Sequence, residues 1–251
     1  MSIRTIAATL AAASLVFAAT ASAEVLRIGS ETTYPPFEFQ DPGSAKYIGF
    51  DIDLIDELAR RAKFTPQIRS MGLDALVPAI MSGNIDVAVS ALSITPERKK
   101  NVDFTKPYYK AELKVMTHKD FAKKIKSAKD LEGAKMCAEI GSSGAMQSRR
   151  IKGTTVRDFN SASEAFMELS KKGCLAMIND SPVNEYFLTQ KASQGMNLVE
   201  LDITFSEDEY GIALKKGNKK LANRLNKALE AMRADGSYNR IHRKWFGVDA
   251  K

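Results

Sequence analysis

The stretch Ile85-Asp86-Val87-Ala88-Val89-Ser90-Ala91-Leu92-Ser93-Ile94-Thr95-Pro96-Glu97-Arg98 contains the clearest structural signal in the chain. Its first half is an apolar run that predicts a buried strand, and its second half predicts the start of a helix. Thr95 is a favourable N-cap residue, and proline suits the first helical position. Arg98 then lies beside backbone N–H groups that have no partner within the helix. A guanidinium beside free amides binds a small carboxylate well, although a lone arginine could equally be a solvated first-turn residue.

The same alternation of apolar runs and helical periodicity continues on both sides of this junction. We predict strands at 25–30, 65–69, 85–90, 113–117, 136–140 and 175–178, and helices at 51–61, 73–81, from 141–144 onward, at 163–171 and twice near the C-terminus, where Leu221, Leu225, Leu229 and Met232 have helical spacing. Strands that alternate with helices are typical of an α/β fold. The pattern breaks at Pro107-Tyr108-Tyr109 and then restarts, which predicts two α/β units.

The first 23 residues have the features of a cleaved secretory signal peptide. Arg4 supplies a positive charge, residues 6–19 are apolar and alanine-rich, and Ala21-Ser22-Ala23 is a small-residue cleavage site. We therefore expect a mature chain that starts at Glu24 and is periplasmic. No later stretch approaches about 18 consecutive apolar residues, so we expect no direct membrane insertion.

Composition argues against several classes of function. The chain has 37 Lys and Arg against 30 Asp and Glu, a formal net charge of +7, but the cations are dispersed in short groups without interleaved aromatic residues. This pattern indicates solvated helix faces and not a nucleic-acid surface. The two histidines, His118 and His242, are far apart, so no metal-ligand set stands out and we expect no cofactor.

No catalytic motif is evident either. Gly141-Ser142-Ser143-Gly144 does not have the spacing of a nucleophile elbow, and no histidine lies near it in the sequence. We therefore predict a protein that is not an enzyme.

Two cysteines, Cys137 and Cys174, allow two interpretations. In an oxidising compartment they could form a disulfide. Both, however, lie beside apolar strand-like runs, where cysteine serves as a small buried hydrophobic residue. If the two runs are neighbouring parallel strands, the cysteines are offset by several residues, which is difficult to reconcile with the short Cα separation of a disulfide. The sequence thus favours two thiols and leaves a disulfide open.

Successive blocks of the chain resemble the periplasmic polar amino-acid-binding proteins of ABC importers (solute-binding protein family 3). The blocks are Thr33-Tyr34-Pro35-Pro36-Phe37-Glu38-Phe39, Ile48-Gly49-Phe50-Asp51-Ile52-Asp53-Leu54, Leu92-Ser93-Ile94-Thr95-Pro96-Glu97-Arg98, Ile140-Gly141-Ser142-Ser143-Gly144, Asn179-Asp180-Ser181-Pro182, Tyr210-Gly211-Ile212-Ala213, Asp235-Gly236-Ser237-Tyr238 and Lys244-Trp245-Phe246. This resemblance implies a two-lobed clamshell that holds a free L-amino acid between its lobes, and a membrane permease as partner. We expect a monomer in which lobe 1 comprises 24–107 and 211–251, lobe 2 comprises 113–205, and 108–112 and 206–210 form a double hinge.

The resemblance also implies roles for the residues that would hold the amino-acid frame. Arg98 matches the arginine that grips the ligand α-carboxylate, and Ser93 and the backbone around Ser142 and Ser143 match additional donors. Asp180 matches the acid that receives the α-ammonium group, assisted by oxygens near Ser90 and Ala91. The alternative for Asp180 is an ordinary helix cap.

Four further residues match positions that line the side-chain pocket of the family: Glu31, Tyr34, Leu73 and Glu139. Two acids at one pocket favour a cationic ligand of the arginine or lysine type. Alternatively, Glu139 turns outward, Tyr34 is a core aromatic residue, and the ligand is a neutral polar amino acid such as glutamine. A sensing receptor domain or a dehydratase on the same fold are less favoured alternatives.

Overall fold

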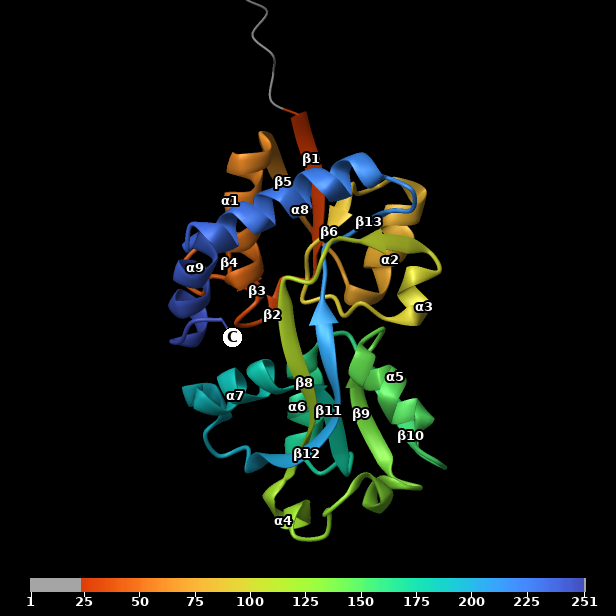
Figure 1. Ribbon diagram of the computed structural model, residues 1–251. Coiled ribbons are helices and arrows are strands. Elements are labelled where there is room, and N and C mark those ends of the chain that lie inside the picture. The colour runs from red at the N-terminus through yellow and green to blue at the C-terminus, as the bar shows by residue number, and fades with distance from the viewer. Residues whose placement is uncertain (1–23, 251) are drawn as a thin grey trace, which may run out of the picture.

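The protein folds into two α/β lobes that are stacked end to end (Figure 1). The structure is a computed structural model that describes residues 24–250. The predicted signal peptide, residues 1–23, lies outside the described residues. The two-lobed α/β architecture agrees with the fold class expected from the sequence.

The first lobe is built on a five-stranded sheet with the order β5-β1-β6-β13-β7. Its strands are β1 (Glu24–Ser30), β5 (Phe64–Ser70), β6 (Val87–Ala88), β7 (Val102–Phe104) and β13 (Ala213–Lys215). β1 is parallel to β5 and β6, whereas β13 is antiparallel to β6 and β7. The predicted strand 85–90 is therefore shorter than expected, although the N–H groups of Asp86 and Val89 still donate to backbone carbonyls of β1.

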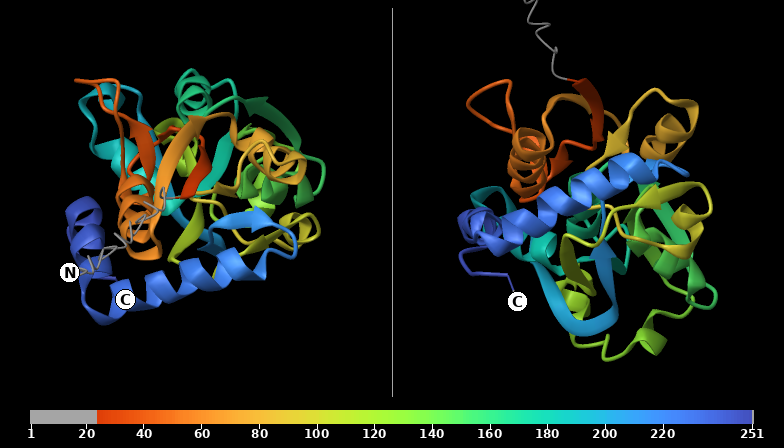
Figure 2. Two further views of the ribbon diagram at one scale, coloured as in Figure 1. Left: turned by 90° about the horizontal axis from the view of Figure 1, so that it is seen from above. Right: turned by 45° about the horizontal axis from the view of Figure 1, so that its top comes forward.

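Helices cover the first sheet on both faces. They are α1 (Phe50–Ala62), α2 (Leu73–Ser82), the four-residue α3 (Pro96–Lys99), α8 (Lys219–Ala234) and α9 (Ser237–Phe246). Leu54 and Leu58 of α1 share one core with Leu225 of α8, while Leu76 and Ile80 of α2 belong to a separate cluster. Figure 2 shows α8 as a long helix along the outside of this lobe. A small antiparallel sheet, β2 (Thr33–Tyr34), β3 (Glu38–Gln40) and β4 (Tyr47–Ile48), completes the lobe.

The second lobe is built on a sheet with the order β10-β9-β11-β8-β12. Its strands are β8 (Tyr109–His118), β9 (Lys135–Glu139), β10 (Thr155–Phe159), β11 (Ala176–Asp180) and β12 (Leu198–Tyr210). Its helices are α4 (Lys119–Ala122), α5 (Ser143–Arg150), α6 (Ala162–Ser170) and α7 (Ser181–Thr189). Two short 3-10 turns, η1 (Ala128–Leu131) and η2 (Lys191–Ser193), complete the lobe. β9 is parallel to β10 and β11, so these three strands end at one edge of the sheet.

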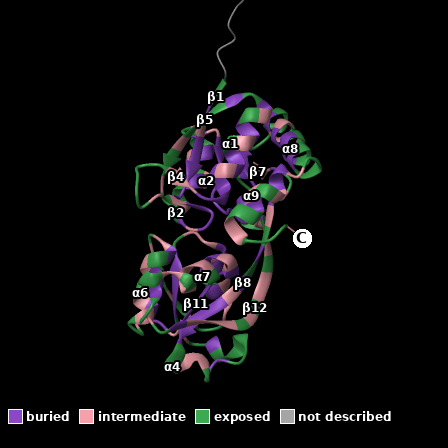
Figure 3. Cartoon of the chain, turned by 90° about the vertical axis from the view of Figure 1, so that its left-hand side faces the viewer, coloured by how far each residue is buried: buried purple, intermediate pink, exposed green. Residues whose placement is uncertain are grey.

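The two lobes are connected by the antiparallel pair β8 and β12, which runs upward from the second lobe in Figure 1. The predicted hinge segments 108–112 and 206–210 lie at the upper end of this pair, where Tyr109 is the register partner of Tyr210. Aromatic rings pack together where these two strands enter the first lobe. The ring centroid of Phe37 lies 5.0 Å from that of Tyr109 and 5.3 Å from that of Tyr210. Buried residues are concentrated in the sheets of both lobes (Figure 3).

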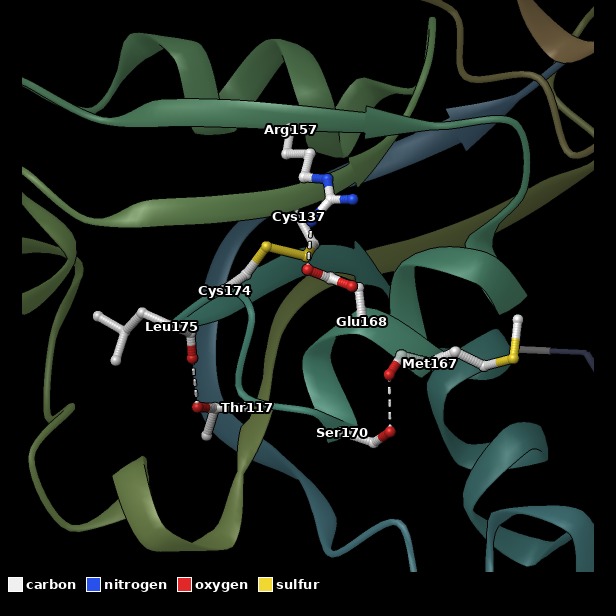
Figure 4. Close-up of a disulfide and its surroundings, with 8 residues drawn as sticks. All are labelled: Thr117, Cys137, Arg157, Met167, Glu168, Ser170, Cys174 and Leu175. Atoms are coloured by element: carbon white, nitrogen blue, oxygen red, sulfur yellow. Dashed lines mark hydrogen bonds and ion pairs between the residues drawn. A yellow bond between two sulfur atoms is a disulfide. The ribbon is translucent and has the colours of Figure 1, made fainter.

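Cys137 and Cys174 form a disulfide, with their Cα atoms 5.7 Å apart (Figure 4). The preference for two thiols was therefore wrong. The two strands are parallel neighbours as assumed, and Cys137 is in register with Met177 of β11. Cys174, however, precedes β11 and lies on the turn that enters it from α6. Because this turn is not extended strand, it brings the second sulfur over the sheet face on which Cys137 packs with α6.

Candidate functional site

A small cavity between the lobes brings together all eleven residues that the sequence singled out. The first lobe contributes Glu31, Tyr34, Leu73, Ser90, Ala91, Ser93 and Arg98, and the second contributes Glu139, Ser142, Ser143 and Asp180. The cavity has a volume of about 20 Å³, so the lobes lie close together around it. A larger cavity of about 390 Å³ opens beside it between α3 and α5. The smaller cavity is the better candidate for a binding site because buried charged groups converge on it.

The ends of parallel strands account for this convergence. Glu31 directly follows β1, Ser90 follows β6, and Glu139 and Asp180 are the last residues of β9 and β11. Ligands of open α/β sheets bind in the crevice outside the carboxyl ends of the strands, which is where these side chains lie.

Arg98 spans the two lobes. Its Nη1 donates to the carbonyl oxygen of Ser93 at 2.8 Å, and its Nη2 donates to the carbonyl oxygen of Gly141 in the other lobe at 2.9 Å. Thr95 caps the helix as predicted, because its hydroxyl accepts from the Arg98 N–H at 3.1 Å. The side chain is only 7% exposed, so the solvated alternative is wrong. Burial lowers the pKa of Arg98 to about 10, which leaves it charged at neutral pH.

Asp180 faces the cavity from the second lobe. It occupies the N-cap position of α7 but makes no capping hydrogen bond with its side chain. Instead, its Oδ2 accepts a hydrogen bond of 2.5 Å from the hydroxyl of Tyr34 in the first lobe, which also lies 3.1 Å from Asn179 Oδ1. Asp180 is 6% exposed, and burial raises its pKa to about 6. The helix-cap interpretation does not account for the side chain, whereas the cavity does. Tyr34 is both a buried aromatic residue and a donor to the site.

Two glutamates make the cavity strongly acidic. Glu139 is 1% exposed and lines the cavity, so the outward alternative is wrong. Burial raises its pKa, and the negative charges of Glu31 and Asp180 raise it further. Burial also raises the pKa of Glu31 to about 7, against the opposing effect of a hydrogen bond from Thr33. Within residues 24–250, Glu139 Oε1 and Asp180 Oδ1 have no hydrogen-bond donor.

The hydroxyl groups of the site divide into two sets. Ser93 Oγ donates to Ser143 Oγ at 3.2 Å across the lobes, so both face the ligand region. Ser142 Oγ caps α5 by accepting from the Ala145 N–H at 3.0 Å. Ser90 Oγ accepts from the Glu31 N–H at 2.9 Å and donates to Glu38 Oε1 at 2.8 Å. The Ser90 hydroxyl therefore already has its hydrogen-bond partners within the protein. Backbone oxygens near Ser90 and Ala91 remain as the candidate acceptors for a ligand.

Glu38 is a cavity-lining residue that the sequence analysis did not select. It lies on β3 and is fully buried. The available signal was an acid placed between Phe37 and Phe39 in an otherwise aromatic run, because a charged residue in such a run requires a specific partner.

Nothing in the described part of the chain assembles a metal site, and neither Ser142 nor Ser143 hydrogen-bonds a histidine there. None of the helices within residues 24–250 combines the length and apolar character needed to cross a bilayer. The geometry supplies one buried cation and several buried acids from two lobes, which suits a small charged ligand.

Comparison with known proteins gives a consistent result over nearly the whole described chain. The sequence model of the bacterial extracellular solute-binding proteins, family 3, matches residues 26–248. The L-arginine-binding protein of Pseudomonas aeruginosa is 33% identical over 231 residues, which cover 89% of this chain and 88% of the relative.

Two solved structures of an ancestral arginine-binding protein are also similar. Both are 38% identical in sequence. The arginine-bound structure has a TM-score of 0.83 and matches 88% of this chain and 98% of that one. The glutamine-bound structure has a TM-score of 0.81 and matches 89% and 98%, respectively.

Proposed function

The chain belongs to the bacterial extracellular solute-binding proteins of family 3, and we propose that it is the periplasmic receptor of an ABC importer that binds a free L-amino acid between its lobes. The observation that carries this proposal is the placement of Arg98 and Asp180. They reach one buried cavity from opposite lobes and bear opposite charges. An amino-acid zwitterion offers the complementary pair of charges at a fixed separation.

In this proposal Arg98 binds the ligand α-carboxylate. Ser93 and Ser143 supply hydroxyl donors beside it, since both line the cavity and already contact each other. Asp180 receives the α-ammonium group, and backbone oxygens near Ser90 and Ala91 provide further acceptors. Every α-amino acid has these two groups, so this part of the site sets the ligand class and not its identity.

We propose a cationic ligand of the arginine or lysine type. Glu31 and Glu139 are buried acids with raised pKa values, and a ligand cation would compensate their charges in a dry site. The similarity to the arginine-binding protein of P. aeruginosa and to the arginine-bound ancestral protein supports this choice. The glutamine-bound ancestral structure keeps a neutral polar amino acid as the second candidate. An anionic ligand would be repelled.

Binding would shift the equilibrium between open and closed lobes. The paired strands β8 and β12 are the segment about which the lobes would move, because they continuously link the two sheets. A ligand that contacts both lobes binds more tightly to the closed form than to the open form, and this difference drives closure. Ligand entry requires the Arg98 guanidinium to exchange its bond to the Gly141 carbonyl for one to the ligand.

A thermal-shift screen against the twenty amino acids, ornithine and citrulline tests the proposal, followed by calorimetric titration of the hits. A specific ligand at 100 times its Kd stabilises the folded protein by about 2.7 kcal/mol, which corresponds to about 5–10 °C in Tm for a domain of this size. Arg98→Ala is the matched control and should reduce the shift to about a third or less. The absence of any amino-acid-dependent shift would refute the proposal.

Transport is distinguished from the two alternative functions by separate measurements. The ligand-bound receptor should stimulate the ATPase of its permease complex in proteoliposomes, whereas a sensing domain should not. Unchanged ligand recovered after long incubation argues against a dehydratase, for which product would accumulate.

A further inference from the structure

We propose that Glu38 and Asp51 form a buried carboxyl pair that shares one proton and acts as a positioning device for the ligand-contacting corner at Ser90 and Ala91. The pair lies in the first lobe, where Glu38 lines the cavity and Asp51 lies next to it, and both residues have no solvent exposure. The effect of the pair on ligand affinity rests on the proposed function. The shared proton is a property of the folded chain and is testable without any ligand.

Glu38 holds the Ser90 side of this corner. Its Oε1 accepts from Ser90 Oγ at 2.8 Å, and Ser90 Oγ in turn accepts from the backbone N–H of Glu31 at 2.9 Å. The hydroxyl proton of Ser90 is therefore directed toward Glu38. Through this chain, one buried acid fixes both the rotamer of Ser90 and the backbone that carries Glu31.

Asp51 holds the Ala91 side. Its Oδ2 accepts from the Ala91 N–H at 2.7 Å and from the Tyr108 hydroxyl at 2.7 Å. Ala91 has φ = 43°, a left-handed conformation that is unfavourable for alanine. The hydrogen bond that this N–H donates to a buried acid offsets the cost and keeps the corner in one conformation.

A proton between the two acids explains their remaining oxygens. Glu38 Oε2 and Asp51 Oδ1 are buried and have no donor in the described chain, yet the two carboxyl groups lie within hydrogen-bonding reach of each other. Two ionised carboxylates in contact would repel strongly in a dry environment. If one is protonated, its O–H donates to the other and both oxygens are satisfied.

Among the described residues, the ionisable groups that face the pair include no cation that could replace this proton. They are the acid Glu31 and the hydroxyls of Tyr34, Tyr108, Tyr109 and Tyr238, while Arg98 is engaged by the carbonyl oxygens of Ser93 and Gly141. Burial, followed by the charges of Asp51 and Glu31, raises the pKa of Glu38. Burial also raises the pKa of Asp51, and the hydrogen bonds that Asp51 accepts limit this rise to about 6. Because Asp51 accepts two hydrogen bonds and Glu38 accepts one, the shared proton resides mainly on Glu38.

Through the Tyr108 hydroxyl, the pair is also connected to the strands β8 and β12 that link the lobes. The Tyr108 N–H donates to the Tyr210 carbonyl at 2.8 Å, and the Tyr108 carbonyl accepts from the Tyr238 hydroxyl of α9. Asp51 thus connects the ligand corner to the segment where β8 and β12 enter the first lobe. We expect loss of the shared proton to loosen both together.

Glu38→Gln tests the inference, because the amide donates a permanent N–H toward Asp51 while its oxygen still accepts from Ser90. A raised folded-state pKa gives stability that is complete below the unfolded value near 4.5 and is lost as pH rises through the folded value. The wild-type protein should therefore lose more stability over this range than Glu38→Gln, which keeps the other buried acids but lacks this one. The Tm of the variant minus that of wild type should increase from pH 5 to pH 9, with the exposed Glu132→Gln as control.

Two further readouts distinguish a positioning role from mere packing. The infrared difference spectrum of wild type minus Glu38→Gln at pH 7 should contain the C=O band of a protonated carboxyl. With L-arginine as ligand at pH 7, the Kd of Glu38→Ala should be about 5- to 100-fold higher than that of Glu38→Gln, because only the alanine variant leaves Ser90 without its acceptor.

A flat difference in Tm together with no protonated-carboxyl band would overturn the shared proton, whether or not any amino acid binds. Equal Kd values for Glu38→Ala and Glu38→Gln would overturn the positioning role. If wild type itself binds no amino acid but the pH profile and band are as expected, the proposed function fails and the carboxyl pair stands.

Discussion

Glu31→Gln should weaken cationic ligands selectively, and only at pH values where Glu31 is ionised. The substitution keeps the size of the side chain and removes its charge. A hydrogen bond to a charged group contributes about 1.5–3 kcal/mol, so above pH 7 the Kd for L-arginine should increase by about 10- to 150-fold. The Kd for L-glutamine should change far less, because a neutral amide end loses only a neutral hydrogen bond.

The pH dependence follows from burial of the Glu31 carboxyl, which raises its pKa to about 7. At pH 7 about half of the molecules carry the charge, and at pH 5 only about one in 100 does. A protonated glutamate resembles glutamine, so the ratio of the variant Kd to the wild-type Kd should fall toward 1 as the pH is lowered. In wild type alone, arginine should therefore bind more weakly at pH 5 than at pH 7 by about 5- to 30-fold from this one residue.

Isothermal titration at pH 5, 7 and 8.5 measures both ratios. Repeating the pH 7 titration in two buffers of different ionisation enthalpy counts the protons released, and the release should be smaller in Glu31→Gln than in wild type. Glu132→Gln, an exposed glutamate of the second lobe, controls for the general effect of removing one acid. Equal weakening of arginine and glutamine, or a ratio that is independent of pH, would refute the reasoning.

Three other substitutions test separate parts of the structure. Either Arg98→Ala or Asp180→Ala should weaken every amino acid by about 2–5 kcal/mol in calorimetric titration, since each leaves an opposite charge unpaired; near-wild-type affinity in both would remove the site. Joint replacement of Cys137 and Cys174 by alanine opens a 37-residue loop and should cost about 4 kcal/mol in denaturant unfolding; a change below 1 kcal/mol would contradict this. Arg150→Gln removes an exposed ion pair between α3 and α5 and should weaken ligand binding by less than about fivefold, an effect that 0.5 M salt should abolish; a larger, salt-insensitive loss would show that the pair matters more than its exposure suggests.

The features that the sequence predicted depend on local signals. Thr95 and Pro96 fix the start of α3, and this places Arg98 where its guanidinium reaches the carbonyl oxygen of Ser93. Parallel strands end at one edge of a sheet, so an acid that ends an apolar run, such as Glu139 or Asp180, can be assigned to that edge without knowing the packing. Local order and strand polarity were therefore sufficient for the fold class, whereas the selection of most site residues rested on the resemblance to the family.

The features that were missed depend on contacts between distant segments. The disulfide depends on the path of the turn that carries Cys174 from α6 into β11, and no spacing rule gives that path. Glu38 depends on how the small sheet β2-β3-β4 packs under Ser90, 52 residues further along the chain. A buried acid in an aromatic run signals that a partner exists, but the sequence does not identify the partner.

Ligand discrimination should reside mainly in the acidic end of the cavity. The groups assigned to the amino-acid frame already contact each other across the lobes, because Arg98 donates to the Gly141 carbonyl and Tyr34 donates to Asp180. A ligand carboxylate must replace the Arg98 bond, so its net gain is a difference between two similar terms, and a ligand ammonium group can bind Asp180 Oδ1, which is free within the described chain; every amino acid gains both of these equally. Glu139 Oε1 has no donor in the part of the chain described here, and its burial is costly whether it is ionised or protonated. A ligand cation that reaches this oxygen adds a bond without displacing one, and we therefore expect the distal charge of the ligand to decide which amino acid binds most tightly.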